Sequence, residues 1–268
     1  MEVSIATIFP SMFEGFLSEG LVARAARKGL VRVTLVNPRD FATDSYKTVD
    51  DYPYGGGPGM VMKAEPVLKA LSSVTGIDYM DDAGASRQGE AERAQGGSGG
   101  VGSRPRIIIL SPQGRRFSQE MANELSTCKS LVLVCGRYKA MDERIRDVLG
   151  AEEVSIGDYV LSGGELAAMV LVESVVRLLP GAMEDKDSAA NDSFAEGLLD
   201  CAYYTRPEVV AGRGVPEVLV SGNHAAIRRW RRKSSLERTL ERRPDLLEKA
   251  TLSEEDRELL EECRKEKA

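Results

Sequence analysis

Short runs of β-branched and aliphatic residues alternate with a segment of helical periodicity near the start of the chain. Residues 3–9 and 30–36 are rich in β-branched side chains and predict strands. Between them, apolar residues recur at helical spacing from 12 to 28, and Gly29 is a favoured residue just after a helix. This strand–helix–strand order favours a crossover connection between two parallel strands.

The same alternation continues further along the chain. Residues 106–110 and 131–135 predict two more strands, each bounded by Gly, Pro or Ser. The apolar segment 166–179 predicts a long helix that ends at Pro180-Gly181. These elements together predict an α/β domain over residues 1–183.

Two segments do not carry the pattern of a packed element. Residues 84–103 hold seven glycines and no Leu, Ile, Phe, Tyr or Trp, which predicts a mobile insertion because little surface can be buried there. A GxGxxG match at 97–102 lacks the preceding strand of a dinucleotide-binding fingerprint, so we attribute it to chance. The polar segment 184–191 predicts a linker to a second, helical domain at 192–268.

The charge of the chain is unevenly distributed. The net formal charge is −6, yet residues 228–243 hold eight basic and two acidic side chains, a local charge of +6. A concentrated basic stripe on an acidic protein is compatible with nucleic-acid binding. Charge alone leaves a solvated helix face equally open. Residues 252–268 predict an acidic amphipathic helix.

Other features exclude whole classes of protein. The longest aliphatic run, 166–172, is far shorter than the roughly 20 apolar residues that cross a bilayer, and no secretory signal is visible. The four cysteines and the one histidine show no disulfide or zinc spacing. We therefore expect a reduced cytoplasmic protein with no bound metal, in which a carboxylate serves as any general acid or base.

Four loops are candidates for ligand contact. Residues 54–60 place four glycines around one proline but lack the Gly-Lys-Ser/Thr ending of a P-loop. Residues 110–114, 136–138 and 156–165 each follow a strand candidate, and ligands of open α/β sheets bind at the carboxyl ends of strands. These loops carry almost no positive charge, which favours a neutral or zwitterionic ligand that contains adenine.

Two side chains have structural interpretations when taken singly. Arg177 is four residues after Glu173, which is the spacing of a helical ion pair. Asp192 is suited to cap a helix that starts near Ser193.

Several strings together give the chain a resemblance to the bacterial tRNA (guanine-N1)-methyltransferase family. The matching strings run in order along nearly the whole chain, at residues 49–60 (Tyr52 excepted), 110–114, 155–165, 192–200 (DSFAEGLLD), 204–208 (YTRPE) and 222–231 (GNHAAIRRWR). The resemblance implies a trefoil-knotted, mostly parallel sheet domain, followed by the smaller helical domain. It also implies a homodimer with the site at the subunit interface. Composition and spacing alone favour an unknotted doubly wound sheet.

The resemblance further implies a ligand set. The methyl donor would be S-adenosylmethionine, and the substrate would be N1 of the guanosine immediately 3′ of the anticodon (position 37) in the tRNA anticodon stem-loop, with no role for DNA or a membrane. Matching cofactor positions are Leu110, Ser111, Pro112, Gln113, Gly114, Gly136, Tyr138, Ile156, Gly157, Tyr159, Leu161, Gly163 and Gly164. Matching substrate positions are Gly59, Ser188, Arg228, Arg229 and Arg231.

By the same resemblance, Asp192 is the general base and Arg177 assists the guanine. The chemistry explains these residue types, because a carboxylate can remove the N1 proton and a guanidinium can stabilise the charge that spreads onto O6. The chain departs from the family pattern at Lys139, where a Glu is usual, and at Ala167, where Pro is common. Two alternatives are a knotted methyltransferase for another RNA and an RNA-binding regulator without catalysis, for which Lys139 is the only hint.

Overall fold

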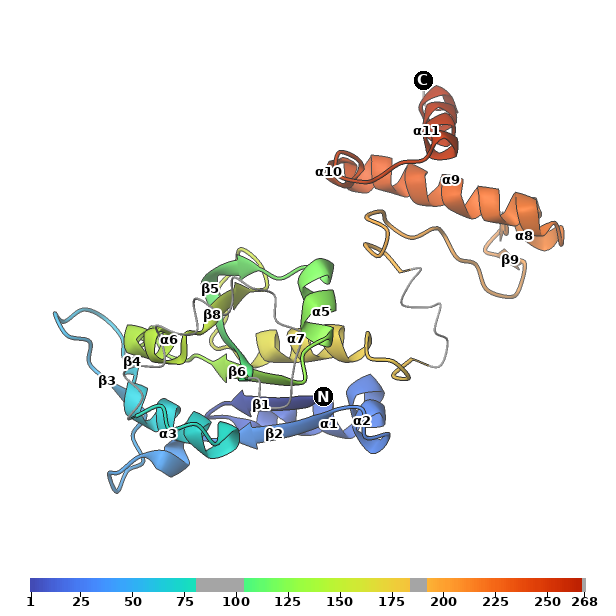
Figure 1. Ribbon diagram of the computed structural model, residues 1–268. Coiled ribbons are helices and arrows are strands. Elements are labelled where there is room, and N and C mark those ends of the chain that lie inside the picture. The colour runs from blue at the N-terminus through green and yellow to red at the C-terminus, as the bar shows by residue number, and fades with distance from the viewer. Residues whose placement is uncertain (81–103, 184–191, 267–268) are drawn as a thin grey trace. The chain divides into compact units, whose positions relative to one another are not determined.

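The computed structural model describes residues 1–80, 104–183 and 192–266 in two compact units, Met1–Glu184 and Asp185–Ala268 (Figure 1). The insertion expected at 84–103 and the linker expected at 184–191 lie outside the described residues. Among the described residues, no helix is long and apolar enough to cross a membrane.

A five-stranded parallel sheet forms the centre of the first unit. Its strands run in the order β2-β1-β6-β5-β8, and every neighbouring pair is parallel. The bounds are β1 Glu2–Ala6, β2 Arg32–Val36, β5 Arg106–Arg116, β6 Ser130–Cys135 and β8 Glu152–Ser155. The mostly parallel α/β sheet predicted from the sequence is therefore confirmed, although β1 ends three residues before the predicted residue 9.

Both faces of this sheet are covered, which explains why β5 and β6 each contain a continuous apolar run. On β5, Ile108 and Leu110 face one core with α2, α5 and α7, whereas Ile107 and Ile109 face the other core with α3 and α6. The helices are α2 Gly20–Arg27, α3 Ala64–Thr75, α5 Gln119–Ser126, α6 Glu143–Leu149 and α7 Glu165–Val176. The helix predicted at 166–179 is thus α7, which ends three residues earlier.

The single helix predicted at 12–28 is wrong. The chain forms a 3-10 turn, η1 (Pro10–Phe13), then α1 (Glu14–Ser18), and α2 begins only at Gly20. Glu19 is extended, and Gly20 has a φ of +71°, a backbone conformation that glycine adopts without steric cost. Apolar residues keep their helical spacing across this break, so the sequence pattern alone does not reveal it.

A small second sheet brings two distant loops together. It pairs β3 (Asp50–Asp51) with β4 (Val61–Met62), and β4 with β7 (Ala140–Met141). A further 3-10 turn, η2 (Pro38–Phe41), precedes β3. The glycine-rich loop 54–60, which connects β3 to β4, therefore lies beside the segment that follows β6.

The second unit is largely helical around a small core of Leu198, Leu236, Leu259 and Leu260. Its elements are β9 Val209–Val210, β10 Arg213–Gly214, α8 Glu217–Val220, α9 His224–Arg242, α10 Pro244–Leu247 and α11 Glu254–Glu266. The acidic helix predicted at 252–268 is confirmed as α11.

Candidate functional site

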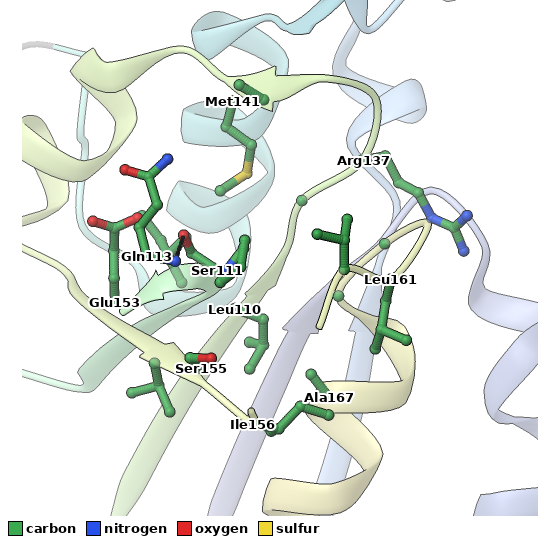
Figure 2. A pocket seen from close by; sticks show the side chains of 18 of the residues that line it. Leu110, Ser111, Gln113, Arg137, Met141, Glu153, Ser155, Ile156, Leu161 and Ala167 are labelled. Atoms are coloured by element: carbon green, nitrogen blue, oxygen red, sulfur yellow. Dashed lines mark hydrogen bonds between the residues drawn. The ribbon is translucent and has the colours of Figure 1, made fainter. Parts of the chain in front are cut away.

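A cavity of about 190 Å³ lies in the first unit, where the loops after β5, β6 and β8 meet (Figure 2). Twelve of the thirteen residues expected to contact a cofactor line it, and they come from three separate loops. These twelve are Leu110, Ser111, Pro112, Gln113, Gly136, Tyr138, Ile156, Gly157, Tyr159, Leu161, Gly163 and Gly164. The fold thus brings together segments that are up to 54 residues apart in sequence.

The thirteenth residue, Gly114, shapes the cavity without lining it. The pairing of β5 with β8 shifts register between Leu110 and Arg115. A Cβ atom at Gly114 would lie 2.3 Å from the carbonyl carbon of Glu153, so only glycine lets the two strands approach so closely. The residues before Gly114 are displaced from the regular ladder and form one wall of the cavity.

The walls combine an apolar part with a polar part. Leu110, Ile156 and Ala167 contribute aliphatic surface, while Gln113 and Glu153 extend from the opposite side (Figure 2). Ligand pockets in proteins are usually apolar with a few placed polar groups. This lining suits a flat ligand with an apolar body and hydrogen-bonding edges.

A buried ionic network anchors the loops, and sequence reasoning missed it. Glu165 is fully buried, and its carboxylate accepts hydrogen bonds from Arg137 Nε (2.9 Å to Oε2) and from Thr7 Oγ1 (2.9 Å to Oε1). The Arg137 guanidinium also lies over the Phe9 ring, 4.5 Å from its centroid. Arg137 also lines the cavity, with its guanidinium directed away from the other labelled side chains (Figure 2), so this network holds one side of the cavity wall in place.

The two glycines before α7 permit a close chain crossing. A Cβ at Gly163 would lie 2.1 Å from Arg137 Nε, and one at Gly164 would lie 2.8 Å from Cys135 Cα. The Gly164 N–H donates to the Gly136 carbonyl at 3.0 Å. The start of α7 is therefore held directly against the loop that follows β6.

Tyr138 lines the cavity, and Gly59 lies next to it. Tyr138 has a φ of +64°, and its hydroxyl accepts a hydrogen bond from Arg39 Nη2 at 3.4 Å. Burial raises the pKa of the Tyr138 phenol. A Cβ at Gly59, expected to contact substrate, would lie 3.1 Å from Lys139 Cβ, so this glycine adjoins a residue of the cavity wall.

The two expected catalytic residues belong to different units. Arg177 is the C-terminal cap residue of α7 in the first unit. Asp192 is half-buried in the second unit, and Ser188 lies outside the described residues. The helix that Asp192 was expected to cap does not form.

The segment after Asp192 folds into turns instead. The Asp192 carbonyl accepts a hydrogen bond from the Ala195 N–H at 3.1 Å. Phe194 and Gly197 have φ values of +75° and +77°, which a right-handed helix does not allow. Asp192 lines a second cavity, of about 350 Å³, together with Arg228 and Arg231.

The basic stripe of α9 divides into two groups. Arg229, Arg232 and Lys233 pair with acidic residues of α11, with nitrogen–oxygen distances of 2.5–2.6 Å to Glu262, Asp256 and Glu266. Arg228 and Arg231 are exposed and make no ion pair with any described residue. Arg229, one of the three arginines expected to contact substrate, therefore forms an ion pair with Glu262 inside the second unit.

Known proteins are similar to this chain over nearly its whole length. A family model described as tRNA (Guanine-1)-methyltransferase TrmD matches residues 1–249. A tRNA (guanine-N(1)-)-methyltransferase of Pseudomonas entomophila (strain L48) is 51% identical over 267 residues, covering 100% of this chain and 98% of the relative. Proteins of the same name are 49% identical in Moorella thermoacetica, covering 98% and 96%, and 50% identical in Aromatoleum aromaticum, covering 98% and 92%.

Proposed function

Because the chain belongs to the tRNA (guanine-1)-methyltransferase family, we propose that it transfers a methyl group to N1 of a guanosine in tRNA. The observation that carries this proposal is the family match over residues 1–249, together with about 50% identity to enzymes of that name over their full length. The target is the guanosine immediately 3′ of the anticodon, position 37. The enzyme works in the cytoplasm on the anticodon stem-loop.

The methyl donor in this proposal is S-adenosylmethionine, and the lining of the cavity in the first unit supports this choice. Leu110, Ile156 and Leu161 would pack on the adenine, and backbone groups of the loops 110–113 and 156–164 would meet its polar edges. Gly163 and Gly164 let the start of α7 pack directly against the loop that follows β6, which holds two walls of the cavity together. When bound, this donor supplies a methyl group that its sulfonium has already activated.

Asp192 is the general base in this mechanism, and Arg177 is the electrostatic stabiliser. Guanine N1 carries a proton and is a poor nucleophile until that proton leaves. The Asp192 carboxylate accepts the N1 proton, and the Arg177 guanidinium stabilises the negative charge that spreads onto O6. Holding N1 in line with the methyl group contributes much of the remaining acceleration.

Asp192 and Arg177 come from different units, so we propose that the site is completed in a homodimer, at the subunit interface. An exposed apolar stripe on α7 supports a second copy as partner, because Leu166 and Val170 are 51% and 43% exposed and lie one turn apart. Exposed Phe9 and Met12 near the start of the chain add to the apolar surface of the same unit.

A trefoil knot is also part of the proposal. After β8, at one edge of the sheet, the chain returns past β5 and β6 to begin α7, where Glu165 hydrogen-bonds Thr7 just beyond β1. Gly163 and Gly164 lie against the loop that follows β6. This close packing of the chain that enters α7 against the loop after β6 supports a threaded connection.

The proposed activity is tested by digesting treated tRNA to nucleosides. Unmodified tRNA incubated with the protein and S-adenosylmethionine should yield 1-methylguanosine. A different methylated nucleoside would identify an enzyme of another specificity. No methylated nucleoside, with cofactor binding intact by calorimetry, would favour an RNA-binding protein without catalysis.

A further inference from the structure

We propose that Lys139 recognises the methyl donor by pairing its ammonium group with the carboxylate of the donor's methionine part. The cavity of the first unit therefore prefers S-adenosylmethionine to the same molecule without that carboxylate. This inference rests on the proposed function for the identity of the donor. Lys139 lines the cavity. The family resemblance gives this lysine no role, because the chain departs from the family pattern at its position.

The charged side chains that line the cavity are equal in number but not all paired. Its three cations and three carboxylates are Arg137, Lys139, Arg146, Asp142, Glu143 and Glu153. Arg137 pairs with the buried Glu165 at 2.9 Å. Arg146 lies 3.4 Å from the Glu143 carboxylate and 3.5 Å from that of Glu153. Lys139 forms no ion pair with any residue that the structure describes.

Asp142, the lining carboxylate closest to Lys139 along the chain, also has a partner of its own. The Arg144 guanidinium donates to it through Nη2 at 2.6 Å and through Nε at 2.9 Å. These hydrogen bonds lower the pKa of the Asp142 carboxyl. Arg144 thus neutralises this carboxylate, and the Lys139 ammonium group is left for an anion that the ligand brings.

The charges of S-adenosylmethionine limit where such a cation is favourable. The molecule carries a sulfonium, an ammonium group and one carboxylate, so two of its three charged groups repel a lysine. A lysine in the cavity wall therefore strengthens binding only when it meets the carboxylate, because attraction and repulsion both weaken with distance. A donor that lacks the carboxylate meets only the repulsion.

The base of the Lys139 side chain is held in a fixed place. The Lys139 N–H donates to the Met60 carbonyl at 3.0 Å, and the next residue begins β7, which pairs with β4. The Lys139 carbons Cβ, Cγ and Cδ lie 3.1–3.8 Å from the point that a Cβ at Gly59 would occupy. Because the stem packs along Gly59, it has fewer rotamers to lose when the ammonium group pairs.

The test is calorimetric titration of the full chain with S-adenosylmethionine and with decarboxylated S-adenosylmethionine. Lys139→Met removes the charge and keeps the length of the side chain. It should weaken binding of S-adenosylmethionine about fivefold, at the upper end for an exposed ion pair, and leave binding of the decarboxylated donor within about twofold. Lys139→Arg keeps the charge and should bind both donors within about twofold of the unchanged protein.

Lys69→Met is the matched control. It removes a lysine of α3 that pairs with Glu65 and does not line the cavity. This variant should bind both donors like the unchanged protein. Thermal unfolding checks that every variant is folded.

Four results would overturn the inference. In Lys139→Met these are an unchanged affinity for S-adenosylmethionine, an equal loss for the two donors, or weaker binding of an anticodon stem-loop with both donor affinities unchanged, which would assign the lysine to RNA. The fourth is binding of neither donor by the unchanged protein.

The outcomes also separate this inference from the proposed function. If the unchanged protein forms 1-methylguanosine while Lys139→Met binds both donors normally, only the inference is wrong. If the variants behave as expected but the unchanged protein forms no 1-methylguanosine, the proposed function fails and the contact with the carboxylate stands.

Discussion

Arg137 and Glu165, 28 residues apart in sequence, form a salt bridge in which the carboxylate is fully buried. The arginine follows β6, and the glutamate begins α7. A second hydrogen bond, from Thr7, ties the same carboxylate to the segment that follows β1. One side chain thus joins three elements at the carboxyl end of the sheet, beside the proposed cofactor cavity.

Replacing Glu165 with Gln should destabilise the first unit and weaken cofactor binding. The change leaves the Arg137 guanidinium without its charge partner, and we expect a loss of about 2–3 kcal/mol in the free energy of unfolding. Urea denaturation and calorimetric titration with S-adenosylmethionine measure the two effects. Glu120→Gln, at an exposed first-turn position of α5, should change neither. Equal behaviour of the two variants would contradict the anchoring role.

Gly164→Ala should abolish tight cofactor binding. The added Cβ would lie 2.8 Å from Cys135 Cα and 3.2 Å from the Gly136 nitrogen, so the crossing of the two chain segments must open. Gly15→Ala is the control, because that glycine lies in α1 with no atom within 4 Å of the added Cβ. It should be neutral or stabilising by up to about 1 kcal/mol. Calorimetry measures cofactor binding and thermal unfolding measures stability for both variants. Unaltered cofactor binding by Gly164→Ala would contradict the need for this close contact between the two chain segments.

Asp192→Asn should lower kcat at least about 100-fold, the usual range for loss of a general base. Arg177→Ala should lower it by a similar factor, because the charge on O6 loses its partner. Single-turnover methylation, with cofactor and tRNA affinities measured in parallel, isolates the chemical step. Asp245→Asn, at an exposed carboxylate of α10, should retain normal turnover. Near-normal turnover of Asp192→Asn would remove Asp192 from the mechanism.

The second unit should lose stability in strong acid through one ion pair. The Arg232 guanidinium lowers the pKa of the Asp256 carboxyl from 3.8 to about 2. A lowered pKa stabilises the folded state fully above pH 3.8, and this contribution of about 2 kcal/mol disappears as the pH falls through 2. Asp256→Asn should lose it at pH 7 and flatten the profile between pH 4 and 2. Circular dichroism during urea unfolding at each pH measures this effect, with exposed Glu258→Gln as control. An unchanged profile in Asp256→Asn would contradict it.

The parallel sheet could be predicted from the sequence because its strands are buried on both faces. Residues 107–110 and 131–135 are unbroken apolar runs, and these runs lie within β5 and β6. The two-residue strands β4 and β7 are too short for any periodicity, so their pairing could not be foreseen. That pairing is what places the loop containing Gly59 beside the cavity.

The ionic network could not be predicted because burial is a tertiary property. A glutamate in the first turn of a helix is expected at the surface, where it favours the helix dipole. Glu165 becomes buried only because Arg137 and Thr7 reach it from distant parts of the chain. The only local sign of this burial in the sequence is that Glu165 directly follows Gly163-Gly164.

The basic stripe illustrates a related limit. Counting charges predicted a single basic surface on α9, but pairing with α11 depends on which side of the helix each residue occupies. Arg229 and Arg232 pair with acidic residues of α11, whereas Arg228 and Arg231 make no ion pair with any residue that the structure describes. These two groups of arginines can be distinguished only in the folded unit.

The central claim is methylation of the guanosine immediately 3′ of the anticodon. Two tRNA transcripts that differ only in G or A at that position are incubated with radiolabelled S-adenosylmethionine and the full chain. The account predicts label in the G transcript alone. Label in both transcripts, or in neither, would contradict it.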